Sequence, residues 1–479
     1  MLFHLKIIDF DLLIEYADTM KKAIWLYPVV FISTVLACLL FLMGTAMIPQ
    51  EALRENVSVS AQYFSDVPLF ENSVGELVNF RKDNYADCIT TGIAWHLGEG
   101  NVYEAVITAE YAREPHENVN VSFRREMSGE EVALENYSRY WHGSAGVVRM
   151  LLLFTDVQNV RYIIATLGLV FNIMLVVTLM RKGHKALGIS YGIAFLLVNG
   201  VFALTCLEYT FVLGIVPLAT LFLLREKIVR QADKAVLSFM VIGMLTAFFD
   251  FLTAETLTFT VPFIMYYLVV RKSSDSAVTV PVKIKRKRGS SADSKEKMHI
   301  DRDWCLLLKS GISWCAGYAV MFLTKWGLAT LVLGKEAFLA SVDSAMERIG
   351  GEVSTTLNMA DEQADLGQRI QGIFQRNLGC LYWGNQEMKA QTVIMITVIV
   401  VTALAVFWYM TRKEKYRSDK VWIPAVVALI PYVRFLVVSN HSYIHYFFTY
   451  RAQLVTVMII LYLIYDSTFL SDKKGKKRK

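Results

Sequence analysis

Two aspartates, Asp83 and Asp87, lie four residues apart in the stretch "DNYADC". On a helix this spacing places both carboxylates on one face. A carboxylate beside another at a membrane surface can act as a general base or bind a divalent cation. The alternative is a solvated acidic turn, because residues 48–147 hold 16 acidic and 7 basic side chains.

A second group of reactive side chains lies in "RFLVVSNHSYIHYFFTYRAQ", residues 434–453. Arg434 and Arg451 could bind a phosphate, because guanidinium groups pair well with phosphate oxygens. His441 and His445 have the i, i+4 spacing of some metal sites, but no glutamate lies between them, so a zinc site is not indicated. The alternative interpretation of this corner is an aromatic anchor at the membrane surface.

The stretch "SRYWHG" brings Arg139, Trp141 and His142 together, and Arg149 follows in the apolar segment 143–158. Tryptophan and tyrosine favour the membrane–water interface, so anchoring is the default interpretation. An arginine and a histidine in the same corner also favour the binding of an anion.

Ionisable side chains also lie within or at the ends of long apolar runs. Each costs roughly 2.5 to 3.5 kcal/mol near the bilayer centre and needs a partner, a cavity or a function. They are Arg149, Arg161, Glu208, Asp250, Glu255, Lys309, Lys325 and Arg434. Any one of them alone can be a structural ion pair or a snorkelling side chain. Because most of them fall toward one side of the membrane, we expect a shared, water-accessible external cavity.

Long apolar helices must position these residues. The chain of 479 residues is 54% hydrophobic, only 19% charged, and has a mean hydropathy of +0.39. Apolar runs of about 20 residues, the length needed to cross the hydrocarbon core, recur along it. The sequence therefore predicts an all-α, polytopic membrane protein and excludes an ordinary soluble domain. About ten transmembrane helices are expected, at residues 24–47, 159–180, 186–205, 207–224, 235–253, 255–270, 304–332, 391–410, 421–438 and 452–470.

Positive charge gathers in the segments that would share one side of the membrane, which hold 31 of the 49 lysines and arginines. By the positive-inside rule these segments are cytoplasmic, so both termini lie inside the cell membrane and the cavity faces outside. The expected organisation is a cytoplasmic segment 1–23, a first transmembrane helix 24–47, an acidic external loop 48–158, helices two to six in 159–270, a basic cytoplasmic loop 271–303, helix seven at 304–332, a second external region 333–390, helices eight to ten in 391–470, and a basic tail 471–479. Within the acidic loop, residues 83–95 and 143–158 are expected to form short interfacial helices.

Several classes of function have no signature in the chain. No GxSxG, HExxH or Walker motif is present. The basic loop 271–303 is explained by topology and by contact with anionic headgroups, so no nucleic-acid partner is predicted. Cys88 and Cys380 would both lie outside, which leaves a disulfide between them as an open alternative.

Four stretches, "NYADCITTGIAW", "SRYWHG", "GMLTAFFDFLT" and "SNHSYIHYFFTYR", resemble in this order a largely uncharacterised family of multipass membrane proteins of Gram-positive bacteria. The layout of that family is similar to the GT-C superfamily of glycosyltransferases, helical membrane enzymes that take sugars from polyprenyl-phosphate carriers. In that superfamily the first external loop carries an acidic catalytic residue, and Asp83 and Asp87 occupy this place here. "DNYADC" departs from the paired Asp-Glu motif of the protein mannosyltransferase branch, so the resemblance leaves open which aspartate is catalytic.

The resemblance implies an integral membrane glycosyltransferase that transfers a sugar from a polyprenyl-phosphate-linked donor to an extracytoplasmic acceptor in cell-envelope polymer synthesis. Its expected partners are membrane lipid, the polyprenyl-phosphate sugar and a saccharide acceptor. The residues expected to bind the substrate are Arg139, Trp141, His142, Arg149, Asp250, Lys325, Arg434, His441, His445 and Arg451.

Two other classes of function stay open. One is a transporter or flippase for a lipid-linked saccharide, which is favoured by Lys309 and Lys325 at two levels of one span. The other is a non-catalytic envelope-assembly protein. The sequence indicates no cofactor, leaves a divalent cation open, and does not identify the sugar, the acceptor or the oligomeric state.

Overall fold

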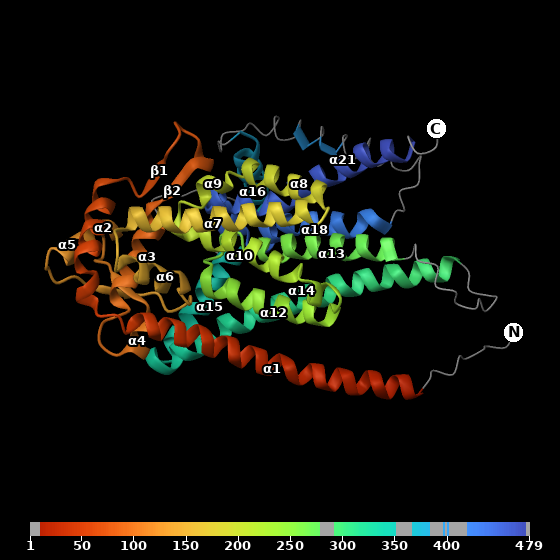
Figure 1. The fold of residues 1–479 in the computed structure, drawn as a ribbon. Coiled ribbons are helices and arrows are strands. Elements are labelled where there is room, and N and C mark those ends of the chain that lie inside the picture. The colour runs from red at the N-terminus through yellow and green to blue at the C-terminus, as the bar shows by residue number, and fades with distance from the viewer. Residues whose placement is uncertain are drawn as a thin grey trace.

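The computed structural model describes residues 10–277, 292–350, 366–383, 396–397, 400–401 and 419–475. Within these ranges the chain is almost entirely helical, and its strands form two short hairpins. This confirms the predicted all-α class. Figure 1 shows a long bundle of helices that carries a smaller mixed segment at one end. We call that segment, residues 47–156, the loop module.

The loop module connects α1 (Phe10–Ala46) to α7 (Val157–Arg181). Each of its hairpins is antiparallel, and in the first Phe70 lies opposite Asp83. Its elements are η1 (Gln50–Leu53), α2 (Arg54–Asp66), β1 (Phe70–Asn72), η2 (Val78–Phe80), β2 (Arg81–Asp83), α3 (Asn84–His96), α4 (Val102–Thr108), β3 (Glu110–Ala112), α5 (Val119–Met127), β4 (Leu134–Asn136) and α6 (Gly143–Leu152).

Helices form at both places where short external helices were expected. The first is α3, and the second is α6, which ends at Leu152 instead of continuing to residue 158. Every residue of α3 from Asp87 to His96 is buried. This helix is therefore the core of the loop module and does not lie flat on its surface.

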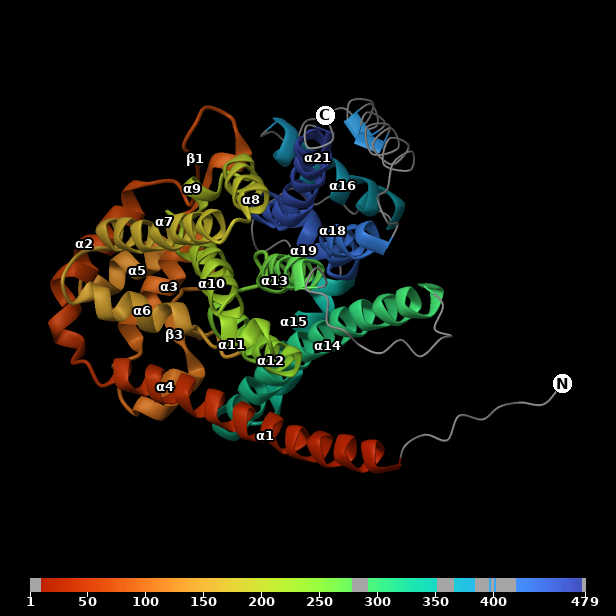
Figure 2. The ribbon, with the colours of Figure 1, turned by 45° about the vertical axis from the view of Figure 1, so that its right-hand side comes forward.

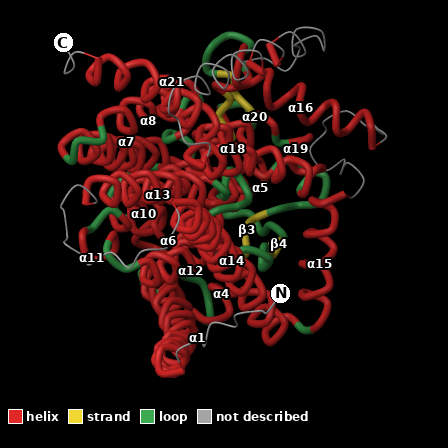
Figure 3. Tube along the Cα trace, turned by 90° about the vertical axis from the view of Figure 1, so that its right-hand side faces the viewer, coloured by secondary structure: helices red, strands yellow, loops and turns green. Residues whose placement is uncertain are grey.

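The remaining helices form the bundle and its connections. Figures 1 and 2 show its helices running side by side, and Figure 3, which looks along the bundle, shows many of them nearly end-on. They are α8 (Lys185–Leu197), α9 (Gly200–Ala203), α10 (Leu207–Leu223), α11 (Glu226–Val229), α12 (Ala232–Phe249), α13 (Leu257–Ala277), α14 (Ala292–Leu333), α15 (Lys335–Gly350), α16 (Leu366–Trp383), α18 (Asp419–Val437), α19 (Ser439–Ile444), α20 (Tyr446–Thr449), η4 (Tyr450–Gln453) and α21 (Leu454–Gly475). The start of α1 and the end of α21 both lie at the end of the bundle opposite the loop module (Figure 1).

Several described helices suit a membrane. Shorter apolar helical segments lie at Lys185–Leu197, Leu207–Leu223, Leu257–Val270 and Val421–Val437. The predicted span 391–410 lies almost wholly outside the described residues. A total of ten spans therefore remains a prediction. Large apolar side chains on the outer face of α1 are exposed, as a lipid-facing surface requires; Trp25 is 74% and Leu40 is 67% exposed. Five segments are long and apolar enough to cross a membrane, namely Trp25–Ala46, Val157–Arg181, Ala232–Phe249, Arg302–Leu333 and Tyr446–Tyr465.

One predicted span is interrupted. The sequence favours a continuous helix over residues 186–205, but α8 ends at Leu197 and the short α9 begins at Gly200. Between them Asn199 adopts a left-handed backbone conformation with φ of 53°. Asparagine tolerates this conformation better than most residues, so the helix can end here. The apolar pattern of the sequence does not indicate this end.

Helices α12 and α14 approach each other closely through two glycines. A Cβ atom at Gly243 would lie 2.2 Å from the carbonyl oxygen of Trp314, and one at Gly317 would lie 2.2 Å from that of Met240. Small residues allow the backbones of membrane helices to come this near. The pair of glycines thus sets the spacing between α12 and α14.

We expect Gly317→Ala to push α14 away from α12 and to lower the free energy of unfolding by about 1–3 kcal/mol, as overpacking does. Gly327→Ala on the same helix is the matched control, because no atom lies within 4 Å of its added Cβ. Thermal unfolding of the purified variants in detergent checks this. Equal midpoints for the two variants would contradict the close contact.

The cysteines are free in this fold. Cys88 lies on α3 inside the loop module and Cys380 on α16, and neither forms a disulfide. The disulfide between Cys88 and Cys380 that the sequence left open is therefore not formed.

Candidate active site

A cavity of about 90 Å³ lies where the loop module meets the helix bundle. Four of the predicted site residues line it: Asp83, His142, His441 and His445. The loop module and the bundle each contribute part of its wall, and α10, α15, α19 and α20 supply most of the bundle's share. The complete lining is Phe70, Asp83, Tyr85, Ala86, Ile89, Thr90, Tyr137, Tyr140, His142, Glu208, Phe251, Arg348, His441, His445 and Phe448.

Asp83 lies at the end of β2 and caps the first turn of α3. Its Oδ1 accepts a hydrogen bond of 2.9 Å from the backbone N–H of Ala86, a common use of aspartate at a helix N-terminus. Burial in the cavity wall raises the pKa of Asp83 to about 7, and the negative charge of Asp87 acts in the same direction. A carboxyl group with such a pKa can accept a proton near neutral pH.

Glu208, in the first turn of α10, brings a second carboxyl group to Asp83. The two carboxyl groups line the same cavity and interact with each other. Two interacting carboxyl groups that are both buried disfavour a second negative charge, so the pair is expected to hold one proton. Oε2 of Glu208 is buried without a hydrogen-bond partner. A buried acceptor of this kind is expected to bond to a ligand or water.

Asp87, one helical turn beyond Asp83, is fully buried and faces Arg161 of α7. The Nε atom of Arg161 donates to Oδ2 of Asp87 at 2.7 Å. Asp87 also accepts hydrogen bonds from the backbone N–H groups of Leu207 and Glu208, at 3.2 and 3.3 Å. The carboxylate therefore joins α3, α7 and the start of α10, and in doing so it places Glu208 beside Asp83. Its oxygens are already occupied by these partners.

Three of the predicted phosphate-binding cations bond to carbonyl oxygens within the protein. Arg149 donates to Thr45, Ile48, Ala94 and Trp95 at 2.5–3.0 Å. Lys325 donates to Val106 at 3.0 Å and to Ile107 at 2.9 Å. Arg451 donates to Phe447 and Asn79, both at 3.1 Å. None of the three lines the cavity.

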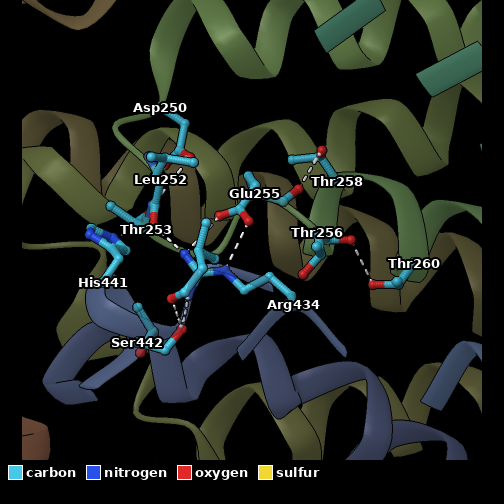
Figure 4. Close-up of polar contacts among 12 residues, drawn as sticks. Asp250, Leu252, Thr253, Glu255, Thr256, Thr258, Thr260, Arg434, His441 and Ser442 are labelled. Carbon is cyan, nitrogen blue, oxygen red and sulfur yellow. Dashed lines mark hydrogen bonds and ion pairs between the residues drawn. The ribbon is translucent and has the colours of Figure 1, made fainter. Parts of the chain in front are cut away.

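The fourth cation, Arg434, forms a buried ion pair with Glu255, which Figure 4 shows. Its Nε and Nη2 atoms reach the two carboxylate oxygens at 2.9 and 3.2 Å, and Nη2 also donates to the carbonyl of Leu252 at 2.6 Å. Asp250 caps the same turn by accepting hydrogen bonds from Leu252 and Thr253. These predicted site residues hold the turn after α12 in place, and Phe251 of that turn, not Asp250, lines the cavity.

The cavity contains three buried imidazoles. Burial lowers the pKa of His142 and of His445 to about 3, and it lowers the pKa of His441 well below its ordinary value. All three are therefore neutral at pH 7. His142 donates from Nε2 to the carbonyl of Tyr137 at 2.8 Å, and His441 donates from Nε2 to Leu252 at 2.9 Å. The Nδ1 atoms of His142 and His445 are buried without partners.

Aromatic rings surround these polar groups. Tyr140 packs edge-on against Tyr137 and Phe251, with ring centroids 5.5 Å apart in both pairs. Trp141, which was expected to bind the substrate, is fully buried and donates to the carbonyl of Met321 at 2.8 Å. Arg139 lies over the ring of Tyr137 at 4.2 Å and does not line the cavity. Tyr137 and Tyr140 line the cavity, and Trp141 does not.

Two charged cavity residues, Glu208 and Arg348, were missed as site residues from the sequence. Glu208 was recognisable as an ionisable side chain at the start of an apolar run, but nothing indicated that it would meet Asp83. Arg348 lies in a charged segment of α15 with no distinguishing pattern. Its guanidinium lies 5.7 Å from the ring of Tyr140.

In the part of the chain that the structure describes, no group of three or more histidine, cysteine, aspartate or glutamate side chains could hold a metal ion. The described cavity thus offers two buried carboxyl groups, neutral imidazoles, aromatic rings and one guanidinium. Comparisons of the chain with protein-family models, with curated proteins and with solved structures found no match.

Proposed function

We propose that this protein is an integral membrane glycosyltransferase. It transfers a sugar from a polyprenyl-phosphate-linked donor to an extracytoplasmic saccharide acceptor in cell-envelope polymer synthesis. The observation that carries the proposal is the pair of buried carboxyl groups of Asp83 and Glu208, which line one cavity at the junction of the loop module and the apolar bundle. A lipid-linked donor has its tail in the bilayer and its reacting sugar just outside it, so a site at such a junction suits it.

In the proposed reaction the Asp83 carboxylate removes the proton from a hydroxyl group of the acceptor. The hydroxyl oxygen attacks the anomeric carbon of the donor sugar, and a new glycosidic bond forms. The bond between that carbon and the phosphate oxygen breaks, and its electron pair leaves with the polyprenyl phosphate. The proton stays on the Asp83–Glu208 pair until water takes it.

The rest of the cavity suits a sugar. The tyrosine and phenylalanine rings offer flat apolar faces, and sugars present C–H groups on one side of the ring. The unpartnered Nδ1 atoms of His142 and His445 are available to hydroxyl donors. These neutral rings can contact hydroxyl groups of a sugar without repelling the carboxyl groups of Asp83 and Glu208.

The proposed orientation puts this cavity outside the cell membrane and both termini in the cytoplasm. Two independent features support it. Basic residues are concentrated in segments that include both termini, and the start of α1 and the end of α21 lie at the bundle end away from the cavity.

The experiment that tests this function uses the full chain purified in detergent with a panel of polyprenyl-phosphate sugars and saccharide acceptors. We expect release of free polyprenyl phosphate together with a glycosylated acceptor. Movement of the lipid-linked saccharide across proteoliposomes with no covalent product would instead establish a flippase and refute the proposal.

The pH dependence of transfer provides a further prediction. Asp83 must be deprotonated to act as a base, and its pKa is raised to about 7. The rate should therefore rise through a midpoint near pH 7 and should be lost as the pH falls below it. Single-turnover rates between pH 5 and 9 check this, with the folded state verified at each pH. A rate that stays constant across that range would show that Asp83 is not the base.

A further inference from the structure

The phosphate group of a substrate needs a cation, and the four cations indicated by the sequence are all committed elsewhere. Arg149, Lys325 and Arg451 donate to backbone carbonyl groups, and Arg434 pairs with Glu255. Moving any of them to a ligand would leave buried carbonyl or carboxylate oxygens without donors, which is unfavourable. These four residues bond to other parts of the protein, and none of them lines the cavity.

Arg348 is the cation that lines the described cavity. It lies in the last turn of α15, where its Nη1 donates to the carbonyl of Ser344 at 2.8 Å. Its Nε atom is buried without a partner. A guanidinium carries five N–H donors in a planar fork that matches a phosphate group. Arg348 therefore has donors available for an anion inside the same cavity as Asp83.

The first residues of α19 hold the end of α15 in place. Oγ of Ser439 donates to the carbonyl of Ile349 at 2.6 Å, and Nδ2 of Asn440 donates to the carbonyl of Glu347 at 3.0 Å. The last carbonyl groups of a helix have no partner within it, so these side chains bond to groups that need donors. The two bonded residues flank Arg348 on both sides. Ser439 and Asn440 thus fix the position of the turn that carries Arg348.

We propose that Arg348 binds the phosphate group of the substrate and that Ser439 and Asn440 are positioning residues for it. This inference rests on the proposed function and names the group that recognises the donor. A guanidinium would also stabilise the negative charge that develops on the leaving phosphate. The shared chemistry is a phosphate anion, whether on a lipid carrier or free in solution.

The test measures binding to the full-length protein in phosphatidylcholine nanodiscs, with polyprenyl phosphate, polyprenol and inorganic phosphate as probes. We expect Arg348→Gln to weaken polyprenyl phosphate binding at least about tenfold, as the loss of a charge-assisted pair does, and to leave polyprenol binding unchanged. Arg348→Lys should recover part of the affinity. Arg54→Gln is the matched control, because Arg54 lies in an exposed pair with Glu51.

The positioning role of Ser439 and Asn440 is tested by combining substitutions. Ser439→Ala with Asn440→Ala should weaken polyprenyl phosphate binding in the wild-type background and have no further effect in the Arg348→Gln background. If Ser439 and Asn440 had a purely structural role, the double substitution would cause the same loss of binding in both backgrounds. That result would overturn their positioning role.

Unchanged polyprenyl phosphate binding in folded Arg348→Gln overturns the assignment of Arg348. If Arg348→Gln does not fold, Arg348→Lys decides, because its affinity should fall below that of wild type. The proposed function is judged separately by product formation in the wild-type protein. Inorganic phosphate that binds at Arg348 as tightly as the lipid phosphate would support the anion site and identify free phosphate as its ligand.

Discussion

Replacing Asp83 with asparagine is expected to abolish sugar transfer and to leave the protein folded. Asparagine is a good N-cap, so Oδ1 can still accept the hydrogen bond from Ala86. What the substitution removes is the basic carboxylate, and a missing general base typically lowers a rate by roughly 10²–10⁴-fold. Initial rates of polyprenyl phosphate release, measured beside the thermal unfolding midpoint, separate the two effects.

The comparison variant is Asp66→Asn, at the end of α2 and away from the cavity. It carries the same chemical change in the same module and should keep the wild-type rate. A folded Asp83→Asn variant with full activity would remove the base from the proposed mechanism. The same loss of rate in Asp66→Asn would show that the effect is not specific to the site.

The second large effect concerns stability. Asp87→Asn should lower the free energy of unfolding by about 3–5 kcal/mol, because it leaves the Arg161 guanidinium buried without a counter-charge. The side chains of this pair are only 6% and 0% exposed. Denaturant unfolding in detergent micelles, followed by the loss of helix signal, measures the change.

The matched control is Glu51→Gln, which breaks the exposed pair with Arg54 and should leave the free energy of unfolding nearly unchanged. Replacing both members of the buried pair, as in Asp87→Leu with Arg161→Met, should recover part of the lost stability, since no unpaired charge then remains. Equal stabilities of Asp87→Asn and Glu51→Gln would contradict the structural role of Asp87.

These two variants together distinguish the aspartates of "DNYADC", which the sequence treated alike. Both were candidates for the base because both are acidic and share a helix face. The structure places Asp83 in the cavity wall and Asp87 in an ion pair with α7. We therefore expect loss of catalysis at the first position and loss of stability at the second.

The helices were predictable because they depend on local pattern. A long apolar run must satisfy its backbone hydrogen bonds within the segment, and a helix does so in the membrane. The positions of α1, α7, α12 and α14 follow from this. The two hairpins were not predicted, because strands of three residues are stabilised by their partner strand, not by their own sequence.

The candidate site was partly predictable. Residue type and spacing in short motifs marked Asp83, His142, His441 and His445, and these line the cavity. The cost of burying a charge in an apolar run marked Arg149, Lys325 and Arg434, which bond to other parts of the protein. The cost of burying a charge shows that each needs a partner, but it does not show whether the partner is a ligand, a carbonyl group or a carboxylate.

The sequence by itself determined the helical class, the apolar segments and the inventory of polar groups, since these follow from composition and from interactions between near neighbours in the chain. Only the tertiary structure decided which polar groups meet. Glu208 joins Asp83, Arg348 enters the cavity, and Asp87 turns to Arg161 because helices distant in the sequence pack together. The roles of these side chains depend on partners that no local pattern specifies.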